Sequence, residues 1–382
     1  MEYNSFCTTE ITFLTREDFE NRILSLNQKN ILLIISGSMA ERYNLERMIL
    51  SLKLIIEGKK GNFIWFKDSF PNPSPQDIIS ALNSIGQRRI DLILAIGGGS
   101  SIDMAKAVSL FRCSFKTYPG ELSYENMIEF LGKKAFPQSG YTDIIAVPTT
   151  TGTGSELTQW ATVWDKSTGT KFSIDTPKLK PKMAMIVPEL TSMMPSEITL
   201  STGLDAFSQA VEAYWSVKTS PIIQEIALNS AGLTMKYLKS AIENPDDKRL
   251  REKLCRASVL SGLAFSQTRT TACHSISYPL TMMFNIPHGI AAAMTLAPVS
   301  EFNRGGFLND TELFALFEEH SGLKNWIEDT SIGILKMCLS YFGVKRSHIN
   351  LIAENSFTAG RIDNNPIPLN KADIVSILNS VY

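Results

Sequence analysis

The stretch DLILAIGGGSSIDMAK, residues 91–106, decides the fold of the first half of this chain. Its apolar start, residues 91–96, is typical of a buried strand, and the end of the stretch opens a helix predicted over residues 102–111. Glycines let the backbone approach a ligand, and a helix N-terminus offers free N–H groups to a phosphate. The turn therefore indicates either a phosphate site or a tight turn that needs glycine. The spacing differs from GxGxxG, so a standard Rossmann site is not predicted.

Short apolar runs alternate with helical patterns across the first half of the sequence. The pattern predicts strands over residues 31–35, 63–66, 91–96, 144–147 and 183–187. Between them it predicts helices over residues 41–56, 78–85 and 102–111. Strands that alternate with helices indicate a mainly parallel sheet with helices on its faces.

The pattern changes after Pro195, where strand-like runs give way to helical periodicity. Helices are predicted over residues 204–215, 221–243 and 249–266, with more behind them. We therefore expect an α/β nucleotide-binding domain over residues 1–194 and an all-helical domain over residues 195–382.

The composition limits the kind of protein. A hydrophobic content of 44% and a net charge of −1 describe a globular protein and argue against nucleic acid or an anionic membrane as partner. The five cysteines are scattered without a CxxC motif, which fits a reducing compartment. The N-terminus lacks a signal-peptide pattern, and no apolar run approaches the roughly 20 residues that span a bilayer. We expect a cytoplasmic enzyme.

A second polar loop, PTTTGTGSE (residues 148–156), follows the predicted strand over residues 144–147. Its hydroxyls and glycines suit a nicotinamide and its ribose, although a generic Ser/Thr turn has the same composition. Its position after a strand adds weight, because ligands of open sheets gather at the carboxyl ends of strands.

The chain holds only four histidines, and two of them, His274 and His288, lie in one segment, HSISYPLTMMFNIPHG. Upstream, GLDAFSQAVEAY predicts a helix on which Asp205 and Gln209 share one face. Two imidazoles, a carboxylate and a carboxamide can hold a divalent metal with a position open for substrate. Glutamine is a weak, neutral ligand, so a metal-free site in which Gln209 only forms hydrogen bonds stays open.

Five segments together resemble the motif series of the iron-containing (group III) alcohol dehydrogenases. They are GGGSSIDMAK, PTTTGTGSE, MIVPELTSMMP, GLDAFSQAVEAYWS and NIPHGIAAAMTL. They follow that family's order and spacing over roughly residues 30 to 300. The resemblance implies a dinucleotide domain, a helical metal domain and hydride transfer between NAD(P)(H) and an alcohol or aldehyde.

The resemblance also assigns roles to individual positions. For the cofactor, it implies contacts from Gly37, Ser38, Gly97, Gly98, Gly99, Ser100, Ser101, Asp103, Thr149, Thr150, Thr153 and Lys171. The glycines and Ser100 fall at the pyrophosphate, the threonines near the nicotinamide, and Lys171 near its ribose. For a divalent metal, Fe²⁺ or Zn²⁺, it implies the ligands Asp205, Gln209, His274 and His288.

The chain departs from the family at three positions. Gln209 replaces a histidine ligand, and its amide oxygen binds Fe²⁺ or Zn²⁺ less tightly than imidazole. Tyr278 stands where many members have another histidine, and it is either a proton donor to the product or a packed aromatic residue. Gly37 replaces an aspartate that meets the adenosine ribose in many NAD-dependent members. Without that carboxylate NADPH becomes somewhat favoured over NADH, unless Gly37 is only a turn residue.

Within the family, DAFSQAVEAYWS and TRTTACHSISYPLT are most similar to phosphonoacetaldehyde reductases, which form 2-hydroxyethylphosphonate. Arg269 stands beside Thr270 in the second segment, and a guanidinium among hydroxyls suits a tetrahedral oxyanion. The alternative for Arg269 is an exposed loop residue.

These observations predict a metal-assisted, NAD(P)H-dependent aldehyde reductase, with His274 and Tyr278 as catalytic residues and Arg269 and Thr270 as substrate contacts. The expected partner is a small anionic aldehyde, and a homodimer is the expected assembly. Three alternatives remain: a general alcohol dehydrogenase of the family, a metal-independent reductase, and a catalytically inactive scaffold.

Overall fold

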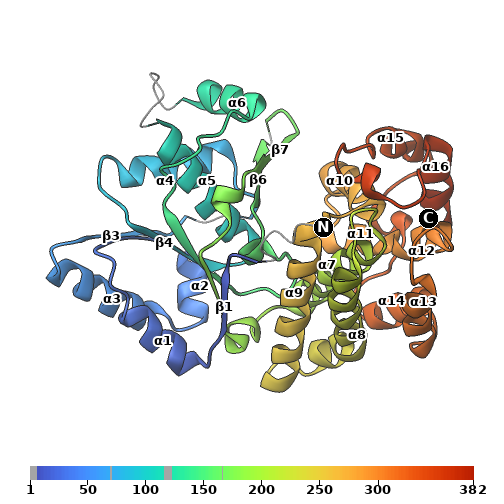
Figure 1. The fold of residues 1–382 in the computed structure, drawn as a ribbon, viewed down its shortest axis with the longest axis horizontal. Helices are drawn as coiled ribbons and strands as arrows, with labels where there is room; N and C mark the ends of the chain where they lie inside the picture. Colours follow the sequence, from blue (N-terminus) through green and yellow to red (C-terminus); the bar gives the residue numbers. More distant parts are fainter. Residues whose placement is uncertain (1–6, 69–70, 116–122, 166) are drawn as a thin grey trace. The chain divides into compact units, whose positions relative to one another are not determined.

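The computed structural model describes residues 7–68, 71–115, 123–165 and 167–382. Packing divides the chain into two compact units. We call them the sheet unit (Met1–Thr150 and Ser155–Met193) and the helical unit (Thr151–Gly154 and Met194–Tyr382). The elements of each unit are labelled in Figure 1.

The sheet unit is built on six parallel strands in the order β1-β8-β5-β4-β2-β3. Their bounds are β1 (Glu10–Phe13), β2 (Asn30–Ile34), β3 (Asn62–Phe66), β4 (Leu92–Gly97), β5 (Asp143–Pro148) and β8 (Met183–Ile186). Every residue of the central strand β4 is buried, as its continuous apolar sequence predicts for a strand covered on both faces. The mainly parallel sheet expected from the sequence is confirmed.

Helices cover both faces of this sheet. Alternate residues of β2 enter different clusters, with Leu32 and Ile34 on one face and Ile31 and Leu33 on the other. The first face is covered by α4 (Pro75–Ile85), α5 (Gly99–Phe115) and α6 (Tyr124–Lys133). The second face is covered by α1 (Arg16–Leu24), α2 (Gly37–Arg42) and α3 (Glu46–Gly58).

Two local features differ from the sequence-based expectations. The single helix predicted over residues 41–56 is wrong, because α2 and α3 are separated by Asn44 at a φ of 51°. Asparagine tolerates this left-handed conformation, which breaks a helix. The antiparallel hairpin of β6 (Trp160–Asp165) and β7 (Thr170–Asp175) was not expected.

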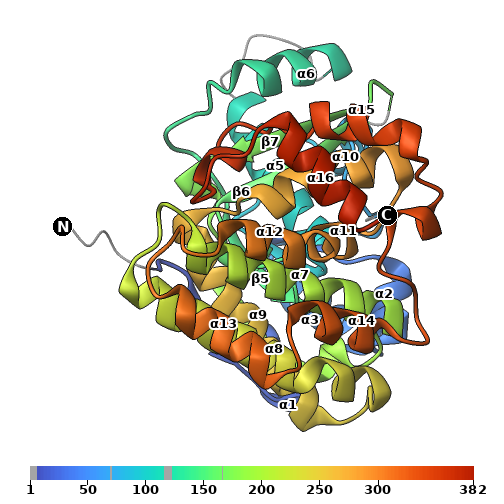
Figure 2. The same cartoon turned by 90° about the vertical axis from the view of Figure 1, so that its right-hand side faces the viewer.

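The helical unit contains no strand among its described residues. Its bounds are α7 (Ser196–Trp215), α8 (Pro221–Glu243), α9 (Lys248–Thr268), α10 (Ala272–Phe284), α11 (His288–Met294), α12 (Leu296–Asn303), α13 (Asp310–Glu319), α14 (Leu323–Ser331), α15 (Ile349–Glu354) and α16 (Lys371–Ser380). Figures 1 and 2 show α8 and α9 side by side. Helix α7 is buried on nearly every side, so its polar residues lie in the interior. Among the described residues, no helix is long and apolar enough to cross a membrane.

Candidate functional site

The turn after β4 has the geometry of a phosphate site. Gly97 takes a φ of 156°, and a Cβ there would lie 2.3 Å from Ser101 Oγ. Helix α5 begins at Gly99, so its first N–H groups have no partner within the helix. A Cβ on Gly98 would lie 3.2 Å from Thr150 Cγ2, which shows how closely this turn approaches the next loop. Glycine at these positions keeps the backbone accessible.

The loop after β5 lies directly beside this turn. Gly97 pairs with Pro148 in the sheet, and Thr149 N donates to Gly97 O at 3.0 Å. The hydroxyl oxygens of Thr149 and Thr150 are buried and have no hydrogen-bond partner among the described residues. Buried polar atoms rarely stay unsatisfied in a native protein unless a ligand or water completes them. These two hydroxyls therefore fit a bound cofactor.

Asp103, a predicted cofactor contact, lies inside the sheet unit. Its carboxylate accepts hydrogen bonds from Ser155 Oγ at 2.6 Å and Thr162 N at 2.9 Å. The neighbouring Lys106 is fully buried and donates to the carbonyls of Ser155 and Trp160, both at 2.7 Å. One oxygen of Asp103 thus bonds the loop and the other bonds β6, and its contact with a cofactor stays a prediction.

Burial shifts the pKa of two charged groups in this region. It lowers the pKa of Lys106 to about 8, against the opposing attraction of Asp103 and Glu156. It raises the pKa of Glu156 to about 7.

The five remaining predicted cofactor contacts occupy four places. Gly37 opens α2 beyond the end of β2, where Ser36 Oγ caps the helix and lies 3.3 Å from Ser38 Oγ. A Cβ on Gly37 would meet no atom of the described residues within 4 Å. Ser100 Oγ accepts from Asn72 N at 3.1 Å.

The other two are Lys171 and Thr153. The ammonium of Lys171, on β7, lies 5.2 Å from the centre of the Trp164 ring. Thr153 belongs to the short segment of the helical unit.

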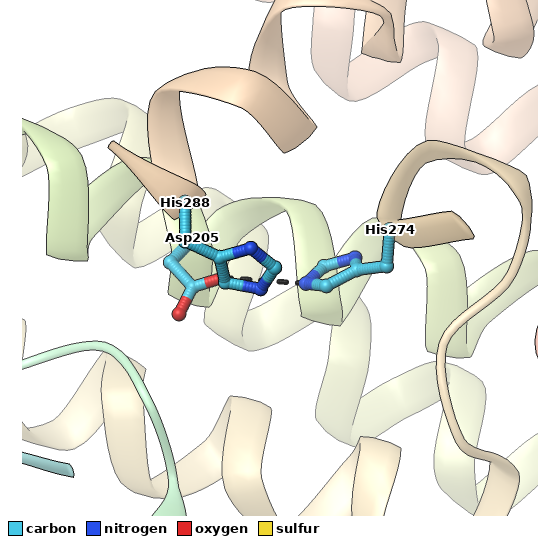
Figure 3. A group of neighbouring side chains, drawn as sticks. All are labelled: Asp205, His274 and His288. Carbon is cyan, nitrogen blue, oxygen red and sulfur yellow. Dashed lines mark hydrogen bonds and ion pairs between the residues drawn. The ribbon is translucent and has the colours of Figure 1, made fainter. Parts of the chain in front are cut away.

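The helical unit brings Asp205, His274 and His288 together, as Figure 3 shows. One ligand atom from each lies within 4.8 Å of the others. His274 Nε2 is 3.2 Å and His288 Nε2 is 4.0 Å from Asp205 Oδ1. Asp205 and His274 are buried, whereas the side chain of His288 is 37% exposed. One carboxylate and two imidazoles with one accessible side fit a divalent metal that keeps a position for substrate.

Close helix packing makes this convergence possible. Asp205 lies on α7, His274 on α10, and His288 is the first residue of α11. A Cβ on Gly289 would lie 1.9 Å from Ser201 O and 2.8 Å from Asp205 Cβ. Only glycine permits α11 to approach α7 this closely, which places His288 against Asp205.

Glu212, a residue that the sequence reasoning missed, supports His274 from behind. Its fully buried carboxylate accepts from Thr271 Oγ1 and Cys273 N, both at 2.8 Å, and from the ring Nδ1 of His274. This bond keeps the ring proton on Nδ1 and leaves Nε2 facing Asp205. Glu212 stands seven positions after Asp205 on the same helix, a spacing that places both on one face.

The electrostatics around His274 favour positive charge. Burial by itself lowers the pKa of His274, but the carboxylates of Glu212 and Asp205 raise that pKa to about 10. A cation held between Asp205, His274 and His288 would compensate the charge of the Asp205 carboxylate.

Gln209 stays a predicted ligand. It is buried on α7, and its Oε1 accepts a hydrogen bond from Ser261 Oγ at 3.3 Å.

Tyr278 stacks on His288, a member of the candidate metal group (Asp205, His274 and His288). Its ring is parallel to that of His288, with an interplanar angle of 3° and 5.8 Å between centroids. Its hydroxyl oxygen accepts from Arg361 Nε at 3.3 Å. Arg269 is the C-cap residue of α9 at a φ of 64°, and Thr270 O accepts from Asn364 Nδ2 at 3.2 Å.

Comparison with known proteins identifies the family. Residues 13–188 match the iron-containing alcohol dehydrogenases, and residues 199–319 match the C-terminal part of the Fe-containing alcohol dehydrogenase family. The chain is 28% identical over 383 residues to an NADPH-dependent butanol dehydrogenase from Clostridium saccharobutylicum, covering 94% of each protein. It is 29% identical over 330 residues to an NAD-dependent methanol dehydrogenase from Bacillus methanolicus, covering 82% of this chain and 83% of that protein.

A solved structure agrees over the whole length. The sulfoacetaldehyde reductase from Bifidobacterium kashiwanohense, in complex with NAD⁺, matches with a TM-score of 0.86 and 27% identity, covering 100% of this chain and 99% of that one. The two family matches and these relatives show that the chain belongs to the iron-containing alcohol dehydrogenases, which are oxidoreductases that use NAD(P) and a divalent metal.

Proposed function

We propose that this enzyme reduces a small anionic aldehyde to a primary alcohol, with phosphonoacetaldehyde as substrate and 2-hydroxyethylphosphonate as product. The observation that carries the proposal is the Asp205–His274–His288 group with Glu212 behind it. The resemblance of residues 205–216 and 268–281 to phosphonoacetaldehyde reductases supports the substrate. The sulfoacetaldehyde reductase adds support, because the substrate in its name is also a two-carbon aldehyde with an anionic group.

In this proposal the helical unit holds the metal and the substrate. Asp205, Gln209, His274 and His288 hold Fe²⁺ or Zn²⁺. When bound, the ion supplies Lewis-acid polarisation of the carbonyl, and reduced nicotinamide supplies the hydride. Glu212 keeps His274 in the tautomer whose Nε2 is available as a ligand atom.

Tyr278 is the proposed proton donor to the product oxygen. Arg361 Nε donates to the phenol oxygen, so this bond does not use the phenol hydrogen. The parallel stack on His288 fixes the ring beside the metal group. Arg269 and Thr270 are the proposed contacts to the anionic end of the substrate.

The sheet unit binds the cofactor in this proposal. The turn of Gly97, Gly98, Gly99, Ser100 and Ser101 takes the pyrophosphate, and the hydroxyls of Thr149 and Thr150 gain partners there. Within the sheet unit, we expect Lys171 to contact the nicotinamide end. Thr153 belongs to the helical unit and stays a separately predicted cofactor contact.

NADPH is the favoured reductant. No carboxylate stands at Gly37 to repel a 2′-phosphate, and the hydroxyls of Ser36 and Ser38 can donate to it.

The test is a single assay matrix. Initial rates are measured with phosphonoacetaldehyde and propanal, with NADPH and NADH, on protein reconstituted with Fe²⁺ or Zn²⁺. We expect kcat/KM to favour phosphonoacetaldehyde by about 10- to 100-fold, the value of one or two charge-assisted hydrogen bonds. Equal values for the two aldehydes would reject the phosphonate assignment and indicate a general alcohol dehydrogenase.

A further inference from the structure

A second arginine, Arg361, lies beside the candidate site, on a segment that no sequence motif marks. Its Nε is 3.3 Å from the hydroxyl oxygen of Tyr278, although the two residues are 83 positions apart. Because Tyr278 stacks on His288, only one side chain separates Arg361 from the candidate metal group.

The segment that carries Arg361 is held firmly against α10 and the turn before it. Thr358 N donates to Ser275 Oγ at 3.0 Å, and Ser275 Oγ donates to Ser356 O at 2.5 Å. Asn364, which is 2% exposed, donates to Thr270 O at 3.2 Å and to Gly360 O at 2.9 Å. These bonds fix the backbone on both sides of Arg361.

The same segment meets Arg269. Gly360 takes a φ of 74°, and a Cβ built on it would lie 3.5 Å from Arg269 Nη1. Arg269 is held in its own left-handed conformation by the bond from its N to Phe265 O at 2.7 Å. Arg269, at the C-terminal end of α9, and Tyr278, on α10, thus lie beside the adjacent positions Gly360 and Arg361.

We infer that Arg361, acting with Arg269, binds the anionic group of the substrate and makes the enzyme selective for a tetrahedral oxyanion such as a phosphonate. A guanidinium presents a planar fork of donors to such a group, and two of them suit a dianion. Arg361 also restrains the Tyr278 hydroxyl, so it couples the anion site to the proposed proton donor. This inference rests on the proposed function.

The experiment compares Arg361→Met with Arg361→Lys in the metal-reconstituted full-length enzyme. For Arg361→Met we expect kcat/KM for phosphonoacetaldehyde to fall about 10- to 100-fold, mainly through KM. The value for propanal should fall less, because only the restraint on Tyr278 is lost. The preference for phosphonoacetaldehyde over propanal therefore shrinks, and Arg361→Lys restores part of it. Ethylphosphonate should inhibit the wild type competitively and the Met variant at least tenfold more weakly.

Two controls separate the outcomes. Arg346→Met removes an arginine that stacks on Tyr382 elsewhere in the helical unit, and we expect it to leave both substrates unaffected. Metal content and melting temperature are measured for every variant, so a folding defect is visible. A wild type without preference for phosphonoacetaldehyde would reject the proposed function. A selective wild type with an equally selective Arg361→Met variant would reject this inference alone.

Discussion

The two units of the chain prepare their candidate sites differently. At the carboxyl ends of β4 and β5, the sheet unit leaves the buried hydroxyls of Thr149 and Thr150 without a hydrogen-bond partner in the part of the chain that the structure describes. In the helical unit, the carboxylate of Glu212 and both ring nitrogens of His274 already have partners. The first site relies on backbone N–H groups and side-chain hydroxyls, so many contacts each contribute a small part of the binding free energy of a ligand. The second site relies on a few buried charged side chains, so each of them contributes a large part of the binding free energy of a metal ion.

The largest effect is expected from His274→Ala. Removing this imidazole deletes a candidate ligand and leaves the carboxylate of Glu212 buried without its ring partner. We expect loss of bound metal and a fall in kcat of about 1,000-fold, equivalent to several kcal/mol of lost charge stabilisation. Elemental analysis and turnover are measured together, with His320→Ala as the control. Retained metal with full turnover would contradict the assignment.

Glu156→Gln tests the cost of a buried charge in the sheet unit. The folded state raises the pKa of Glu156 from 4.5 to about 7, so it holds this proton more tightly than the unfolded chain does. Stability from this group is present below pH 4.5 and is lost as the pH rises to about 7. At pH 8 the Gln variant should be more stable than the wild type by up to roughly 3 kcal/mol. Melting temperatures across the pH range give the difference, and a constant difference would be inconsistent with the shift.

Glu212→Gln tests whether the carboxylate behind His274 matters for the metal. The substitution keeps the size of the side chain and removes its charge. We expect metal affinity, measured by competition with a chromophoric chelator, to weaken about 10- to 100-fold. Glu225→Gln, on α8, serves as the matched control. An unchanged affinity would show that Glu212 only stabilises the fold.

We expect Thr149→Val to give the smallest effect. It should raise the stability of the cofactor-free protein and lower the affinity for the cofactor. The valine removes a buried hydroxyl that no described residue pairs with, so the cofactor-free protein should gain roughly 1 kcal/mol of stability. Cofactor affinity should weaken about 3- to 10-fold, because one contact is lost. Calorimetric binding and thermal unfolding test the two signs. If KM and Kd for NADPH are both unchanged in the variant, Thr149 does not contact the cofactor.

The sequence predicts the central part of the sheet because strands buried on both faces are continuous apolar runs. It does not predict β1, which is only four residues long and is defined by its pairing with β8, far along the chain. The break between α2 and α3 depends on the conformation of Asn44, which helical periodicity alone does not reveal.

The candidate metal group is predicted in part for similar reasons. The four-residue spacing of Asp205 and Gln209 on one helix and the occurrence of His274 and His288 in one short segment are both visible in the local sequence. Glu212 was not predicted, although it lies seven positions after Asp205 on the same helix face. That helical spacing is the signal that identifies it. Arg361 reaches Tyr278 only through tertiary packing, and no pattern in the sequence connects residues 83 positions apart.

The central claim is that aldehyde reduction requires a divalent ion held by Asp205, His274 and His288. The most direct measurement strips the protein with a chelator, restores Fe²⁺ or Zn²⁺ stepwise, and records bound metal and NADPH-dependent reduction of phosphonoacetaldehyde in the same samples. Turnover is predicted to rise in proportion to bound metal and to level off at about one ion per chain. Full turnover in the metal-free protein would contradict the claim.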